Sequence, residues 1–355
     1  MRVLLIKLSS MGDVIHTLPA ITDAMHNIPN LEITWVIEPG FQEIAQWHPA
    51  VKEVIALPLR SGKVRDIWQA IKRIRAQHYD LVVDSQGLLK SAIFAKLAKA
   101  KIKAGLDWTS SREAIASLFY NRKCTVNFQQ HAVVRARKLF SQVFRYQLDL
   151  SHLDYGLHWD QITQSNVAEK PYIVFLHGTT WESKHWPDEY WFALADIAAS
   201  NGYAVQVTWA TPEQKARATA LAQRCSNVQM LPHLTIQQAA TVLHHAQGVV
   251  AVDTGFAHLS AALDKPLVGI YGPTDIKQSG TVGNRNVNLA SKFACAPCEQ
   301  RICRYVGERS VNPPCFQEIS PQLVWHNLMV LIKDPSSRPS RAEHGAVAGI
   351  CHIES

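Results

Sequence analysis

The sequence lacks any apolar run near the ~18 residues that a membrane-spanning helix requires. Its first residues, Met1 to Lys7, are apolar over only a few positions before Lys7 interrupts them, so they are too short for the hydrophobic core of a signal peptide. Both absences favour a cytoplasmic protein whose opening residues form a first strand.

Several nucleotide-site signatures are also missing. The chain has no Walker loop. It also has no G-x-G-x-x-G turn, and this second absence argues against a nicotinamide enzyme. Glu38, at the end of a predicted strand, would nevertheless suit a ribose contact. It has no D-x-D pair of the kind that bridges a diphosphate through a divalent cation. We therefore expect no cofactor and a metal-independent leaving-group site. Aromatic and basic residues are not interleaved as in a stacking platform, so nucleic acid is not an expected partner.

A disulfide framework is not indicated, because the seven cysteines are odd in number and no secretion signal accompanies them. Four of them form the pattern Cys295-x2-Cys298-x4-Cys303-x11-Cys315. The first pair has zinc-ligand spacing, but the second pair does not follow the ribbon rule. We expect reduced loop thiols and no metal site. A structural zinc, an iron–sulfur cluster, or a redox pair of Cys295 and Cys298 remains open.

What the chain does have is an uneven distribution of charge. The net charge is +7, but residues 1–150 hold 21 Lys and Arg against 12 Asp and Glu, whereas residues 151–355 hold 15 against 17. A basic first half predicts an acidic partner, such as nucleic acid, an anionic membrane surface or a small acidic substrate. A generally basic, soluble surface would give the same balance.

Strand-like and helix-like runs alternate along the chain, which predicts parallel sheets with helices on both faces. We predict an α/β fold of two Rossmann-like doubly wound domains facing a cleft. The domains are residues 1–160 and 165–333, followed by a disordered tail at 334–355. Strands are expected near 2–7, 33–37, 53–57, 80–84, 101–105, 172–176, 203–208, 228–231, 248–252 and 267–271, and helices near 64–76, 87–98, 188–200, 213–224, 235–246 and 320–333, with 273–318 rich in loops.

The most informative segment is the strand–turn–helix pattern from Val249 to Leu259. Asp253 or Thr254 can cap the helix, and Gly255 allows a ligand to approach the backbone. The helix N-terminus then offers free N–H groups and a positive dipole end to a phosphate or pyrophosphate, with His258 one turn further on. A capped turn without a ligand is equally compatible with the pattern.

Two other loops follow predicted strands and carry reactive side chains. Thr179 and Thr180 could bind phosphate oxygens, and Lys184 could neutralise a developing pyrophosphate charge. Alternatively, Lys184 is a solvated loop lysine. Asp13 follows the first strand, where a carboxylate can act as a general base. By position alone, capping of the next helix is the simpler role for Asp13.

Together these motifs resemble those of the heptosyltransferases of lipopolysaccharide synthesis, which are inverting glycosyltransferases with the GT-B fold. The resemblance extends in order from residue 1 to about 275. It is carried by Lys7–Ala20, Asp84–Ser91, Ser117–Lys123, His177–Thr180, Lys184–Pro187, Asp253–Gly255 with His258–Leu259, and Tyr271–Asp275.

The resemblance implies a donor, ADP-heptose, bound by the second domain, and an acceptor, a Kdo sugar of Kdo-lipid A, bound by the first. Asp13 would be the general base, and Lys184 would stabilise the departing ADP. The implied donor contacts are Thr179, Thr180, Lys184, Gln214, Leu234, Asp253, Thr254, Gly255 and His258. The expected acceptor contacts are Ser10, Gly12, Arg60, Lys63, Arg112, His131 and Arg135.

Some features leave the assignment open. The family places a glutamate where Gln214 stands here, with Glu213 one residue earlier. The segments Ser9–Asp13 and Lys184–Pro187 favour the family member that adds the first heptose over the one that adds the second. A non-catalytic binder of anionic lipid or nucleic acid is the alternative from another class, and it would function without Asp13. Because the implied acceptor is a lipid, we expect peripheral association with the cytoplasmic face of the inner membrane.

Overall fold

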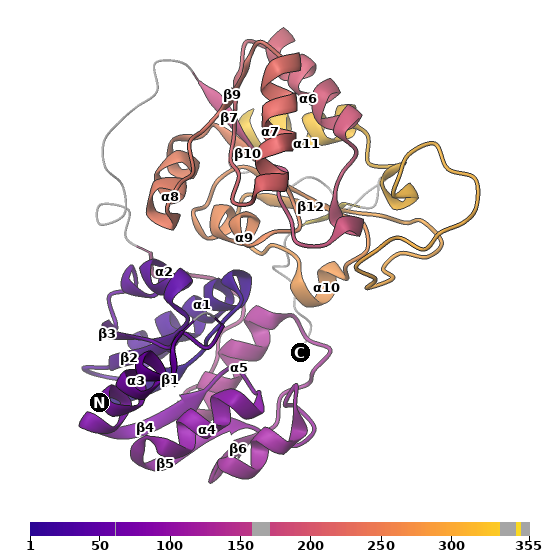
Figure 1. Cartoon of the computed structure of the whole chain (residues 1–355). Coiled ribbons are helices and arrows are strands. Elements are labelled where there is room, and N and C mark those ends of the chain that lie inside the picture. The colour runs from indigo at the N-terminus through magenta and orange to yellow at the C-terminus, as the bar shows by residue number, and fades with distance from the viewer. Residues whose placement is uncertain (61, 158–170, 334–345, 349–355) are drawn as a thin grey trace. The chain divides into compact units, whose positions relative to one another are not determined.

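The computed structural model describes residues 1–60, 62–157, 171–333 and 346–348. The chain divides into two compact units, Met1–Gln161 and Ile162–Ser355, and each is an α/β sheet with helices on both faces (Figure 1). The predicted α/β class, with two doubly wound sheets, is thus confirmed. Of the tail predicted at 334–355, only β13 (Ala346–Ala348) lies within the described residues.

Unit 1 is a six-stranded parallel sheet in the order β3-β2-β1-β4-β5-β6. Helices α1, α2 and α5 pack together, and so do α3, α4 and η2. The elements are β1 (Arg2–Ile6), α1 (Met11–Asn27), β2 (Glu32–Ile37), η1 (Pro39–Phe41), α2 (Gln42–Gln46), β3 (Val51–Ala56), α3 (Val64–Ala76), β4 (His78–Asp84), α4 (Leu89–Leu97), β5 (Lys99–Leu106), η2 (Ala114–Phe119), β6 (Arg122–Cys124) and α5 (Ala132–Phe144).

Unit 2 repeats the architecture in the order β13-β12-β11-β10-β7-β8-β9, parallel except for β13. Its elements are β7 (Tyr172–Leu176), η4 (Glu182–Lys184), α6 (Asp188–Ser200), β8 (Ala204–Val207), α7 (Pro212–Arg224), β9 (Val228–Met230), α8 (Ile236–His245), β10 (Gly248–Val252), α9 (Gly255–Ala262), β11 (Leu267–Tyr271), α10 (Ile276–Ser279), β12 (Asn286–Ala290), η5 (Pro314–Phe316) and α11 (Pro321–Lys333).

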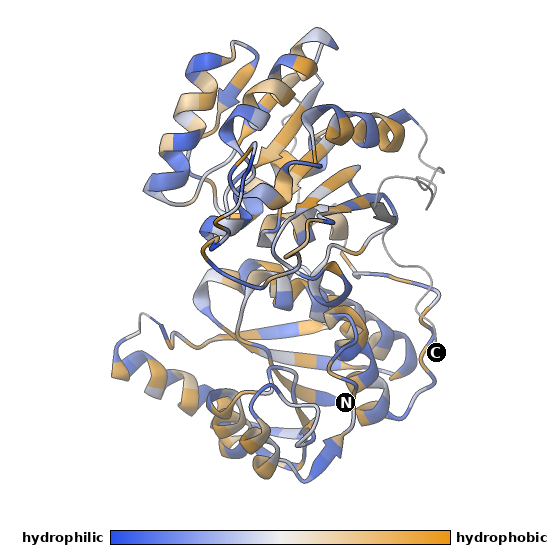
Figure 2. Ribbon diagram, turned by 90° about the vertical axis from the view of Figure 1, so that its right-hand side faces the viewer, coloured by the Kyte–Doolittle hydropathy of each residue, from blue (hydrophilic) through white to orange (hydrophobic). Residues whose placement is uncertain are grey.

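The strands are buried on both faces, which explains their continuous apolar runs. In unit 1, Leu4, Ile6 and Val82 pack against α3 and α4. In unit 2, Trp186 is fully buried, and its indole N–H donates to the carbonyl of Ile319 at 3.0 Å. Figure 2 shows the apolar strands at the centre of each unit and the mixed polarity of the helices that cover them.

The sheet order places the functional loops. In each unit the chain reverses direction across the sheet at a switch point, between β1 and β4 in unit 1 and between β7 and β10 in unit 2. Ligands of doubly wound sheets bind beyond the carboxyl ends of the strands at such points. Asp13 follows β1, Lys184 follows β7 and Asp253 follows β10. Within the described ranges, no helix combines the length and apolarity needed to cross a bilayer.

Three strands fall outside the sequence predictions, and one of them, β13, lies in the segment expected to be a disordered tail. β6 has only three residues, two of which are charged, so it carries no apolar run. β12 lies in the segment expected to be rich in loops, because its alternate residues Asn286 and Asn288 are poor strand formers. Both asparagines are buried, and their amides donate to the carbonyl of Thr281 at 3.0 and 2.8 Å. This local network replaces the apolar contacts that the sequence lacks.

Candidate functional site

Unit 1 holds a carboxylate with a counter-charge at the end of β1. The Asp13 carboxylate lies 3.4 Å from the Lys7 ammonium through Oδ1 and accepts hydrogen bonds at 3.0 Å from the backbone N–H and hydroxyl of Ser10 through Oδ2. Asp13 therefore caps α1, as the simpler interpretation predicts. Burial raises the pKa of the Asp13 carboxyl, but the Lys7 charge and the Ser10 hydrogen bonds outweigh it and hold the pKa below its ordinary value. Asp13 is thus ionised at neutral pH.

The same carboxylate faces a pocket of about 250 Å³ within unit 1. The side chains of Arg112 and Arg135 line it beside the Lys7 ammonium and the Asp13 carboxylate. The Arg135 guanidinium lies 4.2 Å from the centre of the Phe128 ring and donates to the carbonyl of Ser110 at 3.1 Å. The pocket can bind an anionic ligand beside a base. The remaining lining residues are His16, Thr17, Ser85, Gln86, Leu106, Phe128, Ala132, Ala136 and Leu139.

The register of β1 against β4 fixes this arrangement. Ile6 pairs with Asp84, so the residues that follow the two strands are neighbours, and Lys7 Nζ donates to the carbonyl of Ser85 at 3.3 Å. Gln86 Oε1 accepts from the backbone N–H groups of Leu8 and Ser9 at 2.8 and 3.3 Å, which ties the loop before α1 to β4. Lys7, Ser85 and Gln86 lie in segments that carry the family resemblance, but their sequence alone assigns them no role.

A buried pair of side chains, Asp84 and Tyr120, lies at the same end of β4. The Asp84 carboxylate is fully buried and accepts a hydrogen bond from the Tyr120 hydroxyl at 2.7 Å. Burial raises the pKa of Asp84, although its hydrogen bonds oppose that effect, and burial together with the Asp84 charge raises the pKa of Tyr120. The hydrogen bond between Asp84 and Tyr120 thus fixes the carboxyl end of β4, next to which Ser85 contacts Lys7 and Gln86 contacts the loop before α1.

The other predicted acceptor residues divide into two groups. Gly12 is buried in the first turn of α1, and the His131 ring contacts that of His16 with centroids 5.4 Å apart, so both lie beside the pocket. Arg60 instead pairs with Glu38 at 3.4 Å and lies 3.5 Å from the Ser9 hydroxyl. Lys63 is exposed at the start of α3 and does not line the pocket.

Unit 2 holds a second charged centre. The Lys184 ammonium pairs with Asp253 Oδ2 at 2.6 Å and lies 4.1 Å above the Trp181 ring. The Thr274 hydroxyl donates to the same carboxylate oxygen at 2.9 Å, and the Thr179 hydroxyl donates to the Asp253 carbonyl at 3.0 Å. The pairing of β7 with β10 therefore brings Lys184 and Thr179 beside Asp253, two segments that are far apart in sequence.

Asp253 leads directly into α9, whose first turn begins at Gly255. The Thr254 side chain does not cap this helix. The Ala257 N–H donates to the carbonyl of Thr254 at 3.0 Å, so the N–H groups of Gly255 and Phe256 are the ones left to face an anion, and the Lys184 ammonium beside them adds positive charge. His258 is buried one turn into α9. Together these groups form a site suited to a pyrophosphate.

Gln214 lies near the carboxyl end of β7, beside Gly178. Its backbone N–H donates to Thr211 Oγ1 at 3.3 Å, while its side-chain oxygen accepts from the N–H of Ala210 at 2.9 Å. A Cβ placed on Gly178 would lie 2.6 Å from the Gln214 amide carbon, so Gly178 is needed for this close approach. Thr180 is exposed in the same loop, and Leu234 is half-buried just before α8.

Two histidines next to this site stay neutral. Burial, aided by the charge of Arg217, lowers the pKa values of His177 and His185 to about 4. Within the described part of the chain, His177 Nε2 has no hydrogen-bond partner. Neither side chain supplies a positive charge to the site at neutral pH.

Among the described residues, no three His, Cys, Asp or Glu side chains are arranged to hold a metal ion, and this includes the four clustered cysteines. Their thiols are free. Burial raises the pKa of Cys295, and raises that of Cys315 to about 12. The cysteine loop nevertheless supports the charged centre, because the carbonyl of Gln300 accepts from the Ser183 hydroxyl at 2.5 Å, next to Lys184.

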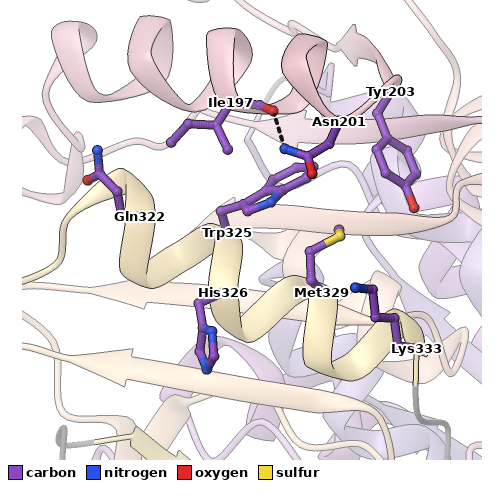
Figure 3. A pocket seen from close by; sticks show the side chains of 8 residues that line it. All are labelled: Ile197, Asn201, Tyr203, Gln322, Trp325, His326, Met329 and Lys333. Atoms are coloured by element: carbon purple, nitrogen blue, oxygen red, sulfur yellow. Dashed lines mark hydrogen bonds between the residues drawn. The ribbon is translucent and has the colours of Figure 1, made fainter.

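A larger pocket of about 510 Å³ lies between α6 and α11, away from these centres. Figure 3 shows Trp325 and Met329 on α11 facing Ile197 and Tyr203, whereas the His326 side chain points away from them. None of the predicted site residues lines it, and no carboxylate lies among its lining residues. It therefore offers no carboxylate base and none of the motifs singled out in the sequence.

The comparisons with known proteins agree on one family. The model for glycosyltransferase family 9 (heptosyltransferase) matches residues 67–307. The chain is 42% identical over 355 residues to lipopolysaccharide heptosyltransferase 1 of Pseudomonas aeruginosa, covering 95% of this chain and 99% of that protein.

Two solved structures are similar over most of the chain. The E. coli heptosyltransferase WaaC with ADP is 42% identical, with a TM-score of 0.77, and the match covers 82% of this chain and 93% of that one. The same enzyme with ADP-2-deoxy-2-fluoro heptose is 38% identical, with a TM-score of 0.78 and coverage of 93% and 99%.

Proposed function

This chain belongs to glycosyltransferase family 9 (heptosyltransferase), and from that premise we propose that it transfers L-glycero-D-manno-heptose from ADP-heptose to a Kdo residue of Kdo-lipid A. The reaction inverts the anomeric carbon and needs no metal ion. It contributes to the inner core of lipopolysaccharide. The observation that carries the proposal is the ionised Asp13 carboxylate, held by Lys7 and Ser10 at a pocket lined by two arginines.

The donor binds to unit 2 in this proposal. The N–H groups of Gly255 and Phe256 at the start of α9 and the Lys184 ammonium receive the diphosphate, and the Thr179 and Thr180 hydroxyls lie in the loop after β7. Gln214, Leu234, Asp253, Gly255 and His258 complete the donor site. Asp253 holds Lys184 in place before the donor arrives. The relatives whose structures contain ADP or an ADP-heptose analogue support this choice of ligand.

The acceptor binds to unit 1. Kdo carries a carboxylate, and lipid A carries phosphates, so Arg112 and Arg135 suit this acceptor by charge. Ser10, Gly12 and His131 border the same pocket. Arg60 and Lys63 would contact a more distant part of the acceptor.

The chemistry requires one proton transfer and one displacement. Asp13 takes the proton of the attacking Kdo hydroxyl, whose oxygen bonds to the anomeric carbon of heptose from the face opposite ADP. The bond from that carbon to the β-phosphate oxygen breaks, and its electron pair leaves with ADP. Lys184 and the α9 amides stabilise the charge on the departing diphosphate. Because the Lys184 ammonium and the α9 N–H groups serve the leaving group, the proposed reaction needs no divalent cation.

The test measures ADP release from ADP-heptose, with and without Kdo-lipid A, in the presence of a chelator. We expect release that depends on the acceptor and survives chelation, together with a product whose anomeric configuration is inverted by NMR. Loss of activity on chelation, restored by a divalent cation, would contradict the metal-independent mechanism. Release only with an acceptor that already carries one heptose would instead make the chain the enzyme that adds the second.

A further inference from the structure

Unit 1 exposes a group of large apolar side chains on one layer of helices. Val64 and Trp68 on α3 are 72% and 59% exposed, Ile93 on α4 is 43% exposed, and Ile115 and Leu118 in η2 are 48% and 64% exposed. These are half of the ten large apolar side chains that are exposed among the described residues. Exposed apolar residues scattered singly need no explanation, but a group on adjoining elements marks an interaction site.

The three elements form a continuous layer. Helix α4 packs against both α3 and η2, and Glu113, just before η2, accepts a hydrogen bond from the N–H of Leu89 at the start of α4 at 2.7 Å. We call the outer face of these elements the α3–α4–η2 surface. Figure 2 shows the apolar and charged residues of the unit 1 helices that form it.

The geometry of α3 orients its exposed residues toward this layer. Arg73 donates to Glu53 of β3 at 2.7 Å, which directs that flank of α3 toward β3. Val64 lies about 180° around the helix from Arg73, at 3.6 residues per turn. Val64 and Trp68, one turn apart, therefore lie on the flank away from β3. Ala70 and Ile74 are buried against the sheet.

Basic side chains surround the apolar ones. Arg65, Lys72 and Arg75 are exposed on α3, and Lys90 and Lys96 flank Ile93 on α4, a helix without any acidic residue. The acidic Asp66 lies about 160° around α3 from Trp68, and Glu113 is engaged at the start of α4. Tryptophan and aliphatic side chains beside lysines and arginines are typical of helices that lie in the interface of an anionic membrane.

We propose that the α3–α4–η2 surface docks onto an anionic lipid bilayer. Val64, Trp68, Ile93, Ile115 and Leu118 enter the headgroup region, and the surrounding lysines and arginines contact anionic headgroups. The surface and the candidate acceptor pocket belong to the same unit, and Arg112, which lines the pocket, precedes η2 in the chain. The inference rests on the proposed function for its purpose, since docking would hold the protein at the bilayer that carries a lipid-anchored acceptor.

The test measures co-sedimentation with phosphatidylcholine vesicles, with and without phosphatidylglycerol. The wild type should bind only vesicles that contain phosphatidylglycerol, and salt should reduce binding. Trp68→Ser with Val64→Ser should abolish most of the binding. Each of Lys72→Gln and Lys90→Gln should lower the partition coefficient about fivefold. Trp108→Ser is the matched control, because Trp108 is 58% exposed in unit 1 but lies outside the surface.

Equal binding to both kinds of vesicle, or equal loss in Trp108→Ser and Trp68→Ser, would overturn the proposal. So would a concentration-dependent dimer that Trp68→Ser dissociates, without vesicle binding, because the surface would then pair two copies of the chain. Thermal melting checks that the variants fold.

A second readout separates this inference from the proposed function. With a deacylated, water-soluble acceptor, ADP release by the surface variants should equal that of the wild type. With acceptor in vesicles, their KM for the acceptor should rise. A wild type that binds anionic vesicles but transfers no heptose would contradict the proposed function and leave the docking surface supported.

Discussion

The ion pair between Asp23 and Arg137 joins the two helices that carry the candidate acceptor pocket. Asp23 lies on α1 and Arg137 on α5. The Arg137 guanidinium is 3% exposed and donates to the two carboxylate oxygens of Asp23 at 2.6 and 3.0 Å, and to the carbonyl of Asp149 at 2.6 Å. The prediction is that Asp23→Ala strongly destabilises unit 1.

The magnitude follows from what the substitution leaves behind. Removing one partner of a buried pair costs about 3–5 kcal/mol, because the other charge stays buried without compensation. Here the Asp23 side chain is 19% exposed, and the Asp149 carbonyl still accepts from the guanidinium. Both features favour the low end, so we expect a loss of about 3 kcal/mol in the free energy of unfolding.

The assay is denaturant unfolding of the full chain, with two controls. Replacing both partners, in Asp23→Leu with Arg137→Met, should restore most of the loss, because no unpaired charge remains. Glu53→Ala breaks a pair whose side chains are 35% and 51% exposed, and should cost under about 1 kcal/mol. If Asp23→Ala costs no more than Glu53→Ala, the argument from burial is wrong.

Three further predictions follow from the two candidate centres. Lys7→Met removes the charge that offsets burial of Asp13, so the Asp13 pKa should rise and the acid limb of kcat/KM should move to higher pH, whereas Lys7→Arg should leave it in place. Gly178→Ala places a Cβ against the Gln214 side chain. Steady-state kinetics should then give a higher KM for ADP-heptose, with kcat changed less than KM. An unchanged KM would contradict a donor site beside Gly178 and Gln214. The pKa of His177 falls from 6.5 to about 4 on folding. Between these two pH values the folded state therefore binds fewer protons than the unfolded state. The free energy of unfolding should accordingly drop as the pH falls from 6.5 to about 4. The loss approaches about 3 kcal/mol at the lower end of this range, and denaturation of His177→Phe over the same pH range should show a smaller decline.

Much of the fold could be predicted because its strands are buried on both faces. Leu4 to Ile6 and Val249 to Val252 are continuous apolar runs, and helices of clear periodicity separate such runs. β12 could not be predicted in this way, since Asn286 and Asn288 satisfy their amides through Thr281, a contact that no periodicity reveals.

The site was predictable to the extent that it consists of loops after strands. Asp13, Lys184 and Asp253 are candidates because ligands of doubly wound sheets gather at strand ends, and the structure places each of them after such an end. The sequence could not decide between capping and catalysis for Asp13. The geometry allows both, because Ser10 occupies one carboxylate oxygen and the other lies beside Lys7.

Contacts that depend on strand register were beyond the sequence. Lys7 approaches Ser85 only because Ile6 pairs with Asp84, and Lys184 approaches Asp253 only because β7 pairs with β10. Net charge predicted an acidic partner for the first half but could not distinguish Arg135, which lines the pocket, from Lys63, which does not.

The central claim is that Asp13 acts as the general base, and Asp13→Asn tests it most directly. Asparagine keeps an oxygen that can accept from Ser10, so the fold and the ADP affinity of unit 2 should be retained. Acceptor-dependent ADP release should fall about 10²- to 10⁴-fold, the usual contribution of a general base. A folded Asp13→Asn variant that binds ADP and releases it from ADP-heptose within a few-fold of the wild-type rate would contradict the account.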